Sequence, residues 1–117
     1  MKKLIYLLAL VLFVSCSGNK IVNSVTKVIG EPSSTVKTPK GGGQYVWNHF
    51  DVAKFEIIKK NIDDAIGCLP VEENVKSIDY KFYQWETSNE KVYLEFNRIK
   101  VGTDNVNNSI QLTIIGK

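Results

Sequence analysis

The stretch "SIDYKFYQWETSNEKVYLEFNRIKV", residues 77–101, decides the fold because apolar and polar side chains alternate on both sides of a polar turn. This pattern predicts two antiparallel β-strands, over residues 77–86 and from 91 to about 101. A two-residue turn at 88–89 fixes which residues face each other. The predicted partners are Trp85 with Val92, Tyr83 with Leu94, Lys81 with Phe96 and Glu86 with Lys91.

The apolar side chains change sides partway along both predicted strands. On the first strand they occupy even positions up to Phe82 and odd positions from Tyr83 onward. On the second strand they occupy even positions up to Phe96 and odd positions from Ile99 onward. Because the two changes fall at the same depth in the hairpin, we predict a β-bulge that bends it.

One side of this hairpin is a candidate binding surface. In the predicted register, Phe82, Gln84 and Tyr93 share the face opposite Trp85. An exposed aromatic face of this kind marks a contact surface for a partner. The sequence is also compatible with a bulge that returns Tyr80 and Phe82 to the core, or with a strand from the N-terminal segment that covers them.

A helix and a third strand accompany the hairpin. Apolar residues recur at spacings of three and four over residues 49–66, with charged residues between them, which predicts an amphipathic helix that ends at Gly67. A third strand is predicted over residues 109–115. The expected fold is therefore an α+β domain over residues 45–117, with one amphipathic helix packed on an antiparallel meander sheet of three to four strands.

This order of elements resembles the cystatin-like architecture, in which a long helix is followed by several antiparallel strands. The protease-binding signature of true cystatins, Gln-x-Val-x-Gly, has no counterpart here, because Gln84 is followed by Trp85-Glu86-Thr87-Ser88. The resemblance therefore implies a fold and carries no activity with it.

The segment before this domain has a different composition. Residues 17–44 contain two prolines, five glycines and many Ser, Thr and Lys residues, which is typical of a linker. We predict that residues 16–44 form a flexible tether. Whether residues 21–30 add a strand to the sheet stays open.

The N-terminus has the order of a secretory signal peptide, predicted over residues 1–15. Two lysines precede an apolar run from Leu4 to Val14, and small residues follow. The run is shorter than the ~20 residues that a membrane-spanning helix needs. We therefore expect the chain to be exported.

The end of this leader, Phe13-Val14-Ser15-Cys16, resembles the lipobox of bacterial lipoproteins. The resemblance implies that the Cys16 thiol receives a diacylglycerol, that cleavage makes Cys16 the first residue, and that membrane lipid holds the protein. The alternative is an ordinary signal peptide with a cysteine near the cleavage site.

The lipoprotein family also implies a location. An aspartate directly after the cysteine can retain such a protein in the inner membrane, and an acidic cluster there can direct surface display in Bacteroidota. Here Ser17-Gly18-Asn19-Lys20 follows Cys16. By this analogy we expect a lipid-anchored envelope protein on the periplasmic side of the outer membrane, with surface exposure left open.

The net charge and the number of cysteines restrict the possible functions further. Loss of Lys2 and Lys3 with the leader lowers the formal net charge from +3 to +1, so the domain has no electrostatic footprint for nucleic acid. With Cys16 lipidated, Cys68 has no partner for a disulfide within the chain. Since a free cysteine behaves as a small apolar residue, we expect Cys68 to be buried.

No catalytic motif is evident in the sequence. His49 is the single histidine and is expected in the first turn of the helix, as a surface or packing residue. Asp63 and Asp64 diverge by about 100° on a helix, and Glu86 and Glu95 are separated along the sheet, so no carboxylate pair converges. We therefore expect a protein without enzymatic activity, metal or cofactor.

The leading hypothesis is a binding module with a protein partner in the cell envelope: an inhibitor, an immunity factor or an accessory subunit. The alternatives are a cofactor-free envelope hydrolase that uses carboxylates, and a purely structural lipoprotein.

Overall fold

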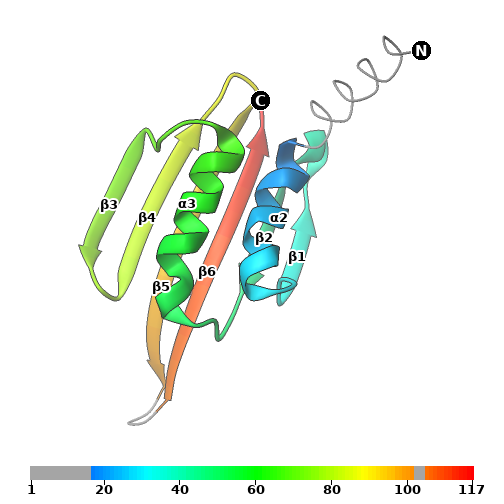
Figure 1. Cartoon of the computed structure of the whole chain (residues 1–117). Coiled ribbons are helices and arrows are strands. Elements are labelled where there is room, and N and C mark those ends of the chain that lie inside the picture. The colour runs from blue at the N-terminus through cyan, green and yellow to red at the C-terminus, as the bar shows by residue number, and fades with distance from the viewer. Residues whose placement is uncertain (1–16, 102–104) are drawn as a thin grey trace.

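The computed structural model describes residues 17–101 and 105–117, and it has an α+β fold (Figure 1). Two helices pack on one face of a six-stranded antiparallel sheet with the strand order β1-β2-β6-β5-β4-β3. The predicted leader and Cys16 lie outside the described residues. The elements are α2 (Ser17–Ile29), β1 (Ser34–Lys37), η1 (Pro39–Gly41), β2 (Gly43–Trp47), η2 (Val52–Lys54), α3 (Phe55–Ile66), β3 (Glu72–Ser77), β4 (Tyr80–Glu86), β5 (Glu90–Val101) and β6 (Asn105–Gly116).

The α+β class was predicted correctly, but one helix and three to four strands were too few. The predicted first strand, residues 77–86, corresponds to β4, which begins only at Tyr80 because Ile78 and Asp79 form a turn. The strand before this turn, β3, was not predicted apart from its last residue, Ser77. Two further strands, β1 and β2, come from the N-terminal segment, and β2 pairs with β6. The sheet is therefore a meander of four strands extended by a hairpin from the other end of the chain.

The predicted register of the β4–β5 hairpin is confirmed. Trp85 faces Val92 and Tyr83 faces Leu94, and the pairing continues without interruption from Tyr80 to Glu86. The predicted bulge in this hairpin is wrong. The register shift lies instead between β3 and β4, at Val75 and Ser77. The alternation continues regularly along β5, so Ile99 lies on the same side as Tyr93, away from the core, and is half exposed.

Helix α3 is shorter at its start than the predicted helix over residues 49–66. The turn η2 precedes it, and the carboxylate of Asp51 accepts the backbone N–H of Ala53 at 3.0 Å. His49 lies in the loop before this turn, with a left-handed φ of 56°, rather than in the first turn of the helix. The helix ends as predicted: Gly67 has φ 87°, and its N–H donates to the carbonyl of Asp63 at 2.8 Å.

The predicted flexible tether over residues 16–44 is wrong for the residues that the structure describes. Helix α2 packs beside α3 in the helical layer, and its Ile21 and Val25 are buried in the core. The side-chain amide of Asn61 donates to the carbonyl of Ser24 at 3.2 Å. At the other end of the helix, the indole N–H of Trp47 donates to the carbonyl of Gly30 at 2.9 Å. Residues 21–30 thus add a helix to the domain, and the strands come later.

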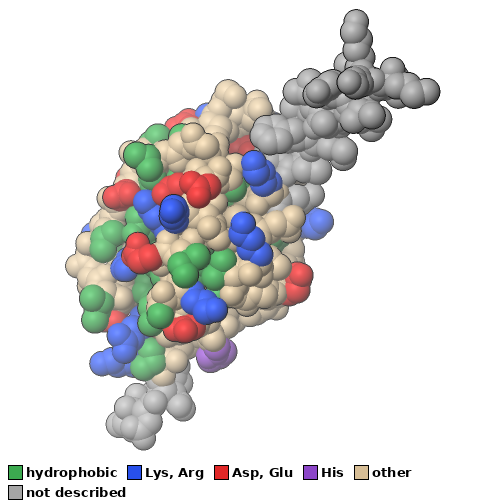
Figure 2. Space-filling model, viewed as in Figure 1, with side chains coloured by type: hydrophobic (Ala, Val, Ile, Leu, Met, Phe, Trp, Pro, Cys, Tyr) green, Lys and Arg blue, Asp and Glu red, His purple; other side chains and the backbone are tan. Residues whose placement is uncertain are grey.

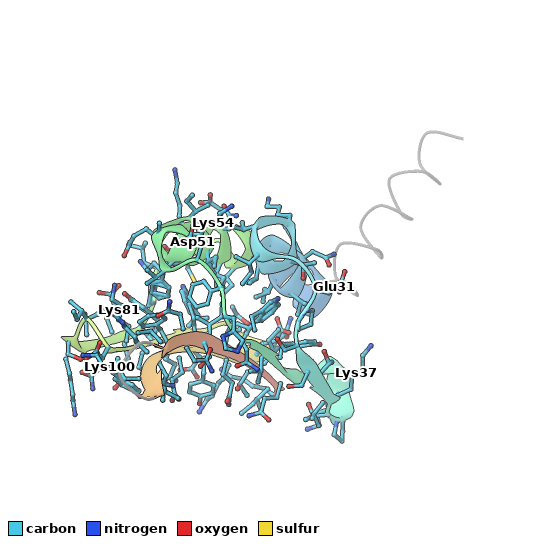
Figure 3. The ribbon with its side chains drawn as sticks, turned by 90° about the horizontal axis from the view of Figure 1, so that it is seen from below. Glu31, Lys37, Asp51, Lys54, Lys81 and Lys100 are labelled. Atoms are coloured by element: carbon cyan, nitrogen blue, oxygen red, sulfur yellow. The ribbon has the colours of Figure 1, made fainter. Side chains whose placement is uncertain are left out.

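The core lies between the two helices and the sheet, as Figure 3 shows from the end of the molecule. Side chains at alternate positions of β2, β4, β5 and β6 point into the core, because successive residues of a strand face opposite sides. The buried apolar residues are Ile21, Val25, Tyr45, Trp47, Phe50, Phe55, Ile58, Ile62, Tyr83, Trp85, Val92, Leu94, Phe96, Ile110, Leu112 and Ile114.

Candidate functional site

The side of the sheet opposite the helices carries no covering element among the described residues. Figure 3 shows both helices above the sheet and only side chains below it. We call this side the open face; its central residues are Phe82, Gln84, Tyr93, Glu95 and Gln111. Because directly paired residues share a face, the register places all five together: Gln84 is paired with Tyr93, and Glu95 with both Phe82 and Gln111.

Two aromatic rings meet on the open face, on the neighbouring strands β4 and β5. The centroids of Phe82 and Tyr93 are 6.0 Å apart, with an angle of 35° between the ring planes. Both side chains are half-buried, because their neighbours on the adjacent strands cover their flanks. Each therefore presents apolar surface to the solvent from a position held by the sheet, which is the arrangement of an aromatic anchor in an interface.

A carboxylate with its own hydrogen bonds lies beside these rings. The side-chain amide of Asn97 donates to Oε1 of Glu95 at 2.8 Å, and the phenol of Tyr80 donates to Oε2 at 3.4 Å. Partial burial, together with the charge of Glu95 and this hydrogen bond, raises the pKa of Tyr80. The phenol consequently remains a neutral donor and keeps Glu95 oriented across the sheet.

The open face continues from the aromatic centre onto β6 and β2 with uncharged polar residues. Thr113 lies beside Tyr93, and Gln44 lies beside Thr113. The open face also carries charges, since the register places Glu86 and Lys91 on it beside Glu95. Figure 2 shows that Lys and acidic side chains are spread over the helix side as well. The open face can therefore contact a partner through aromatic surface, amides and hydroxyls.

The structure brings the three predicted face residues together. Phe82, Gln84 and Tyr93 lie on one face, opposite Trp85, as the register implied. The two other arrangements do not occur, since β4 has no bulge toward β5 and the N-terminal segment packs elsewhere. Sequence reasoning did not assign Tyr80 and Glu95 to the site. Both could have been assigned to this face, because Tyr80 is two residues from Phe82 on β4 and Glu95 is two residues from Tyr93 on β5.

A second group of polar side chains lies where α3 meets β3 and β4. The ammonium of Lys59 is 3.1 Å from Oδ2 of Asp63 and 3.5 Å from Oε1 of Glu73. The other oxygen of Asp63 accepts the indole N–H of Trp85 at 2.8 Å. Burial opposes the charge on Lys59, but the two carboxylates outweigh it and raise the pKa of Lys59.

Asp63 and Glu73 share one counter-ion, the ammonium of Lys59, and Asp63 is also held by the indole of Trp85. These contacts join α3 to the strands β3 and β4.

Other residues considered in the sequence lie outside both groups. Cys68 is exposed, so the prediction that it is buried is wrong: Gly67 turns the chain away from the core and directs Cys68 into solvent. His49 is exposed as well.

In the described part of the chain, no group of three or more His, Cys, Asp or Glu side chains is placed to hold a metal ion. Among the same residues, no helix is long and apolar enough to cross a membrane.

Comparisons of the chain with protein-family models, with curated proteins and with solved structures found no match.

Proposed function

We propose that this chain is a small lipoprotein of the bacterial cell envelope that acts as a non-catalytic binding module. Lipid at Cys16 holds it in the membrane, on the periplasmic side of the outer membrane. The open face, centred on Phe82, Gln84 and Tyr93, contacts a protein partner. The partner class is an envelope component that the module inhibits, neutralises or assists.

One observation carries this proposal: a six-stranded sheet covered by helices on one face has an aromatic pair on its other face. A sheet face that served only to separate core from water would be expected to be polar, since antiparallel sheets alternate apolar and polar side chains in that case. Half-buried aromatic rings beside amides and a hydrogen-bonded carboxylate are the composition of a protein interface.

The face is tested by crosslinking in the native envelope. A photoreactive residue at Gln84 is expected to capture a partner, whereas the same residue at Lys60, exposed on the helix side, is not. Tyr93→Ala should weaken the capture about tenfold, the loss expected when an aromatic anchor of an interface is truncated. Ile57→Ala is the matched control, because Ile57 is 52 % exposed on the other side of the molecule.

Equal capture from both positions, or full capture by a folded Tyr93→Ala variant, would contradict the assignment of the open face. Far-ultraviolet circular dichroism of the variant establishes that it is folded. The anchor has its own test: radiolabelled palmitate should enter the wild-type protein and not Cys16→Ser. Label that persists in Cys16→Ser would contradict lipidation at this cysteine.

A further inference from the structure

The two edge strands of the sheet differ in the length of edge that they offer. β1 has four residues and lies between Pro32 and Pro39, so a strand that pairs with it cannot continue past either end. β3 has six residues, and only its start is preceded by a proline, Pro70. Among the described residues no element lies beyond β3, which forms the side of the sheet away from α2 in Figure 1. β3 is therefore the longer edge to which another strand can be added.

The backbone of β3 has hydrogen-bonding groups directed away from the sheet. The carbonyl of Asp79, directly before β4, accepts an N–H from β5 at 2.8 Å, so the odd-numbered residues of β4 hydrogen-bond with β5. The even-numbered residues are directed to β3, and the carbonyl of Gln84 accepts an N–H from the residue before β3 at 2.8 Å. On β3 the same alternation leaves the N–H and C=O of Glu73 and Val75 on the outer side.

The side chains of β3 are complementary to a second copy of the same strand. Two antiparallel copies exchange backbone hydrogen bonds when Glu73 of one lies opposite Val75 of the other. A two-fold axis then passes between the two Asn74 residues, and Glu72 lies opposite Lys76 on each side of the axis. Directly opposed charges of unlike sign stabilise strand pairing, whereas charges on an edge discourage strands that do not match them. The charges of β3 therefore favour pairing with a second copy.

The other groups along this edge fit the same register. Glu73 keeps the ammonium of Lys59 as its own counter-ion, at 3.5 Å. Lys76 lies where the register with β4 shifts, so it has no opposite residue on β4. Asp79 lies outside the paired stretch. Val75, which is 54 % exposed, becomes covered by the added strand. This register places no like charges opposite each other.

We propose that β3 is a dimer interface, at which the edge strands of two copies of this chain pair in antiparallel orientation and join their sheets. The inference goes beyond the proposed function and does not depend on the lipid at Cys16. Because the two-fold axis of such a pair is perpendicular to the sheet, both open faces lie on the same side. Phe82 is paired with Asn74, so the two copies of Phe82 are three strand spacings apart, about 14 Å. The dimer thus presents two aromatic pairs on one surface, and a partner with two matching sites is held by both.

Disulfide crosslinking of the full chain tests this pairing. In a Cys68→Ser background, Asn74→Cys places one thiol of each copy at the two-fold axis, where the Cα atoms of a pair of this kind are about 4.5 Å apart. A disulfide spans roughly 4.4–6.8 Å between Cα atoms. Two copies with different epitope tags are coexpressed and oxidised with copper phenanthroline in lysed cells, so the test does not depend on export. Val36→Cys, exposed on the other edge strand, is the matched control.

Asn74→Cys should give a dimer that carries both tags, and Val36→Cys should not. Adding Lys76→Glu to the Asn74→Cys protein should slow dimer formation about fivefold or more, because two pairs of unlike charges become pairs of like charges. Adding Glu72→Lys as well exchanges the two charges and should restore the rate. Lys37→Glu, on β1, is the matched charge control and should leave the rate unchanged.

A crosslink to another protein in place of a second copy would overturn the inference. Equal dimer formation by Val36→Cys, or a charge exchange that does not restore the rate, would also overturn it. If Asn74→Cys does not fold, Glu73→Cys in one tagged copy and Val75→Cys in the other provide the second test. These two copies should crosslink to each other, and absence of that crosslink would overturn the pairing while leaving lipidation and the open face as proposed.

Discussion

Asp63 is the residue through which α3 holds the sheet. One of its oxygens accepts the indole N–H of Trp85 and the other pairs with Lys59. Trp85 itself is fully buried, so its N–H depends on this acceptor. Leaving a buried donor unpaired costs about 1–3 kcal/mol.

We therefore expect Asp63→Ala to lower the free energy of unfolding by about 1–3 kcal/mol, measured by urea denaturation. Asp64→Ala is the matched control. Asp64 is the next residue of the same helix and is exposed, so the change should stay within about 0.5 kcal/mol. Equal effects of the two substitutions would show that the hydrogen bond to Trp85 contributes nothing.

Tyr83 links stability to alkaline pH. Burial, with the negative charges of Glu56 and Glu73, raises the pKa of Tyr83 above the ordinary value of 10.0. The folded state therefore holds the phenolic proton more tightly than the unfolded state. Its contribution to stability is complete below pH 10 and is lost as the pH rises toward the pKa in the folded protein.

The free energy of unfolding should consequently fall between about pH 9 and about pH 11, on either side of the ordinary tyrosine pKa. Tyr83→Phe should show a smaller fall over the same interval, because it has no phenol to ionise. Urea denaturation at both pH values measures the difference. An identical fall in the variant would assign the alkaline sensitivity to other groups, among them Lys59, whose raised pKa acts in the same direction.

The position of a single residue could be predicted from the sequence where the strand pattern determined which face of the sheet it occupies. Outside the strands such predictions were less successful. Phe82, Gln84 and Tyr93 could be placed on one face because alternation and the turn determine the register. Cys68 could not be placed, because its exposure depends on the direction in which the chain leaves Gly67. That direction follows from tertiary packing, which the local sequence does not contain.

At the scale of elements, α2 differs most from its prediction. Its sequence is rich in β-branched residues, which have low helix propensity and favour a strand or a linker interpretation. Yet Ile21 and Val25 are spaced four residues apart and both are buried. Packing of this face against α3 and the sheet supplies the stability that propensity does not.

Helix α2 is therefore expected to be essential to the domain. Val25→Asp buries an unpaired carboxylate and should lower the free energy of unfolding by about 4 kcal/mol or more. Asn23→Asp introduces the same charge on the exposed side of the same helix and should cost less than about 0.5 kcal/mol. Thermal denaturation followed by circular dichroism compares them. A tether would tolerate both substitutions equally.

At the scale of the whole molecule, the sheet order depends on a contact between distant parts of the chain. The pairing of β2 with β6 joins residues 43–47 to 110–114. Neither strand carries a local sequence signal that identifies the other as its partner. The short turn between β4 and β5, in contrast, makes those two strands pair with each other. This is why the hairpin and its register could be predicted while the six-stranded sheet could not.

The presence of α2 in place of a flexible tether also limits the distance that the domain can reach from its N-terminal attachment point. An unstructured chain of 28 residues could extend about 90–100 Å, but a helix of 13 residues rises only about 20 Å. Under the proposed lipid anchor at Cys16, the longest strands, of 12 residues, bring the domain to roughly 40 Å above that helix start. An anchored protein with this reach would meet molecules that share its membrane. The proposal therefore implies a target confined to the same bilayer, where surface density gives it a high effective concentration.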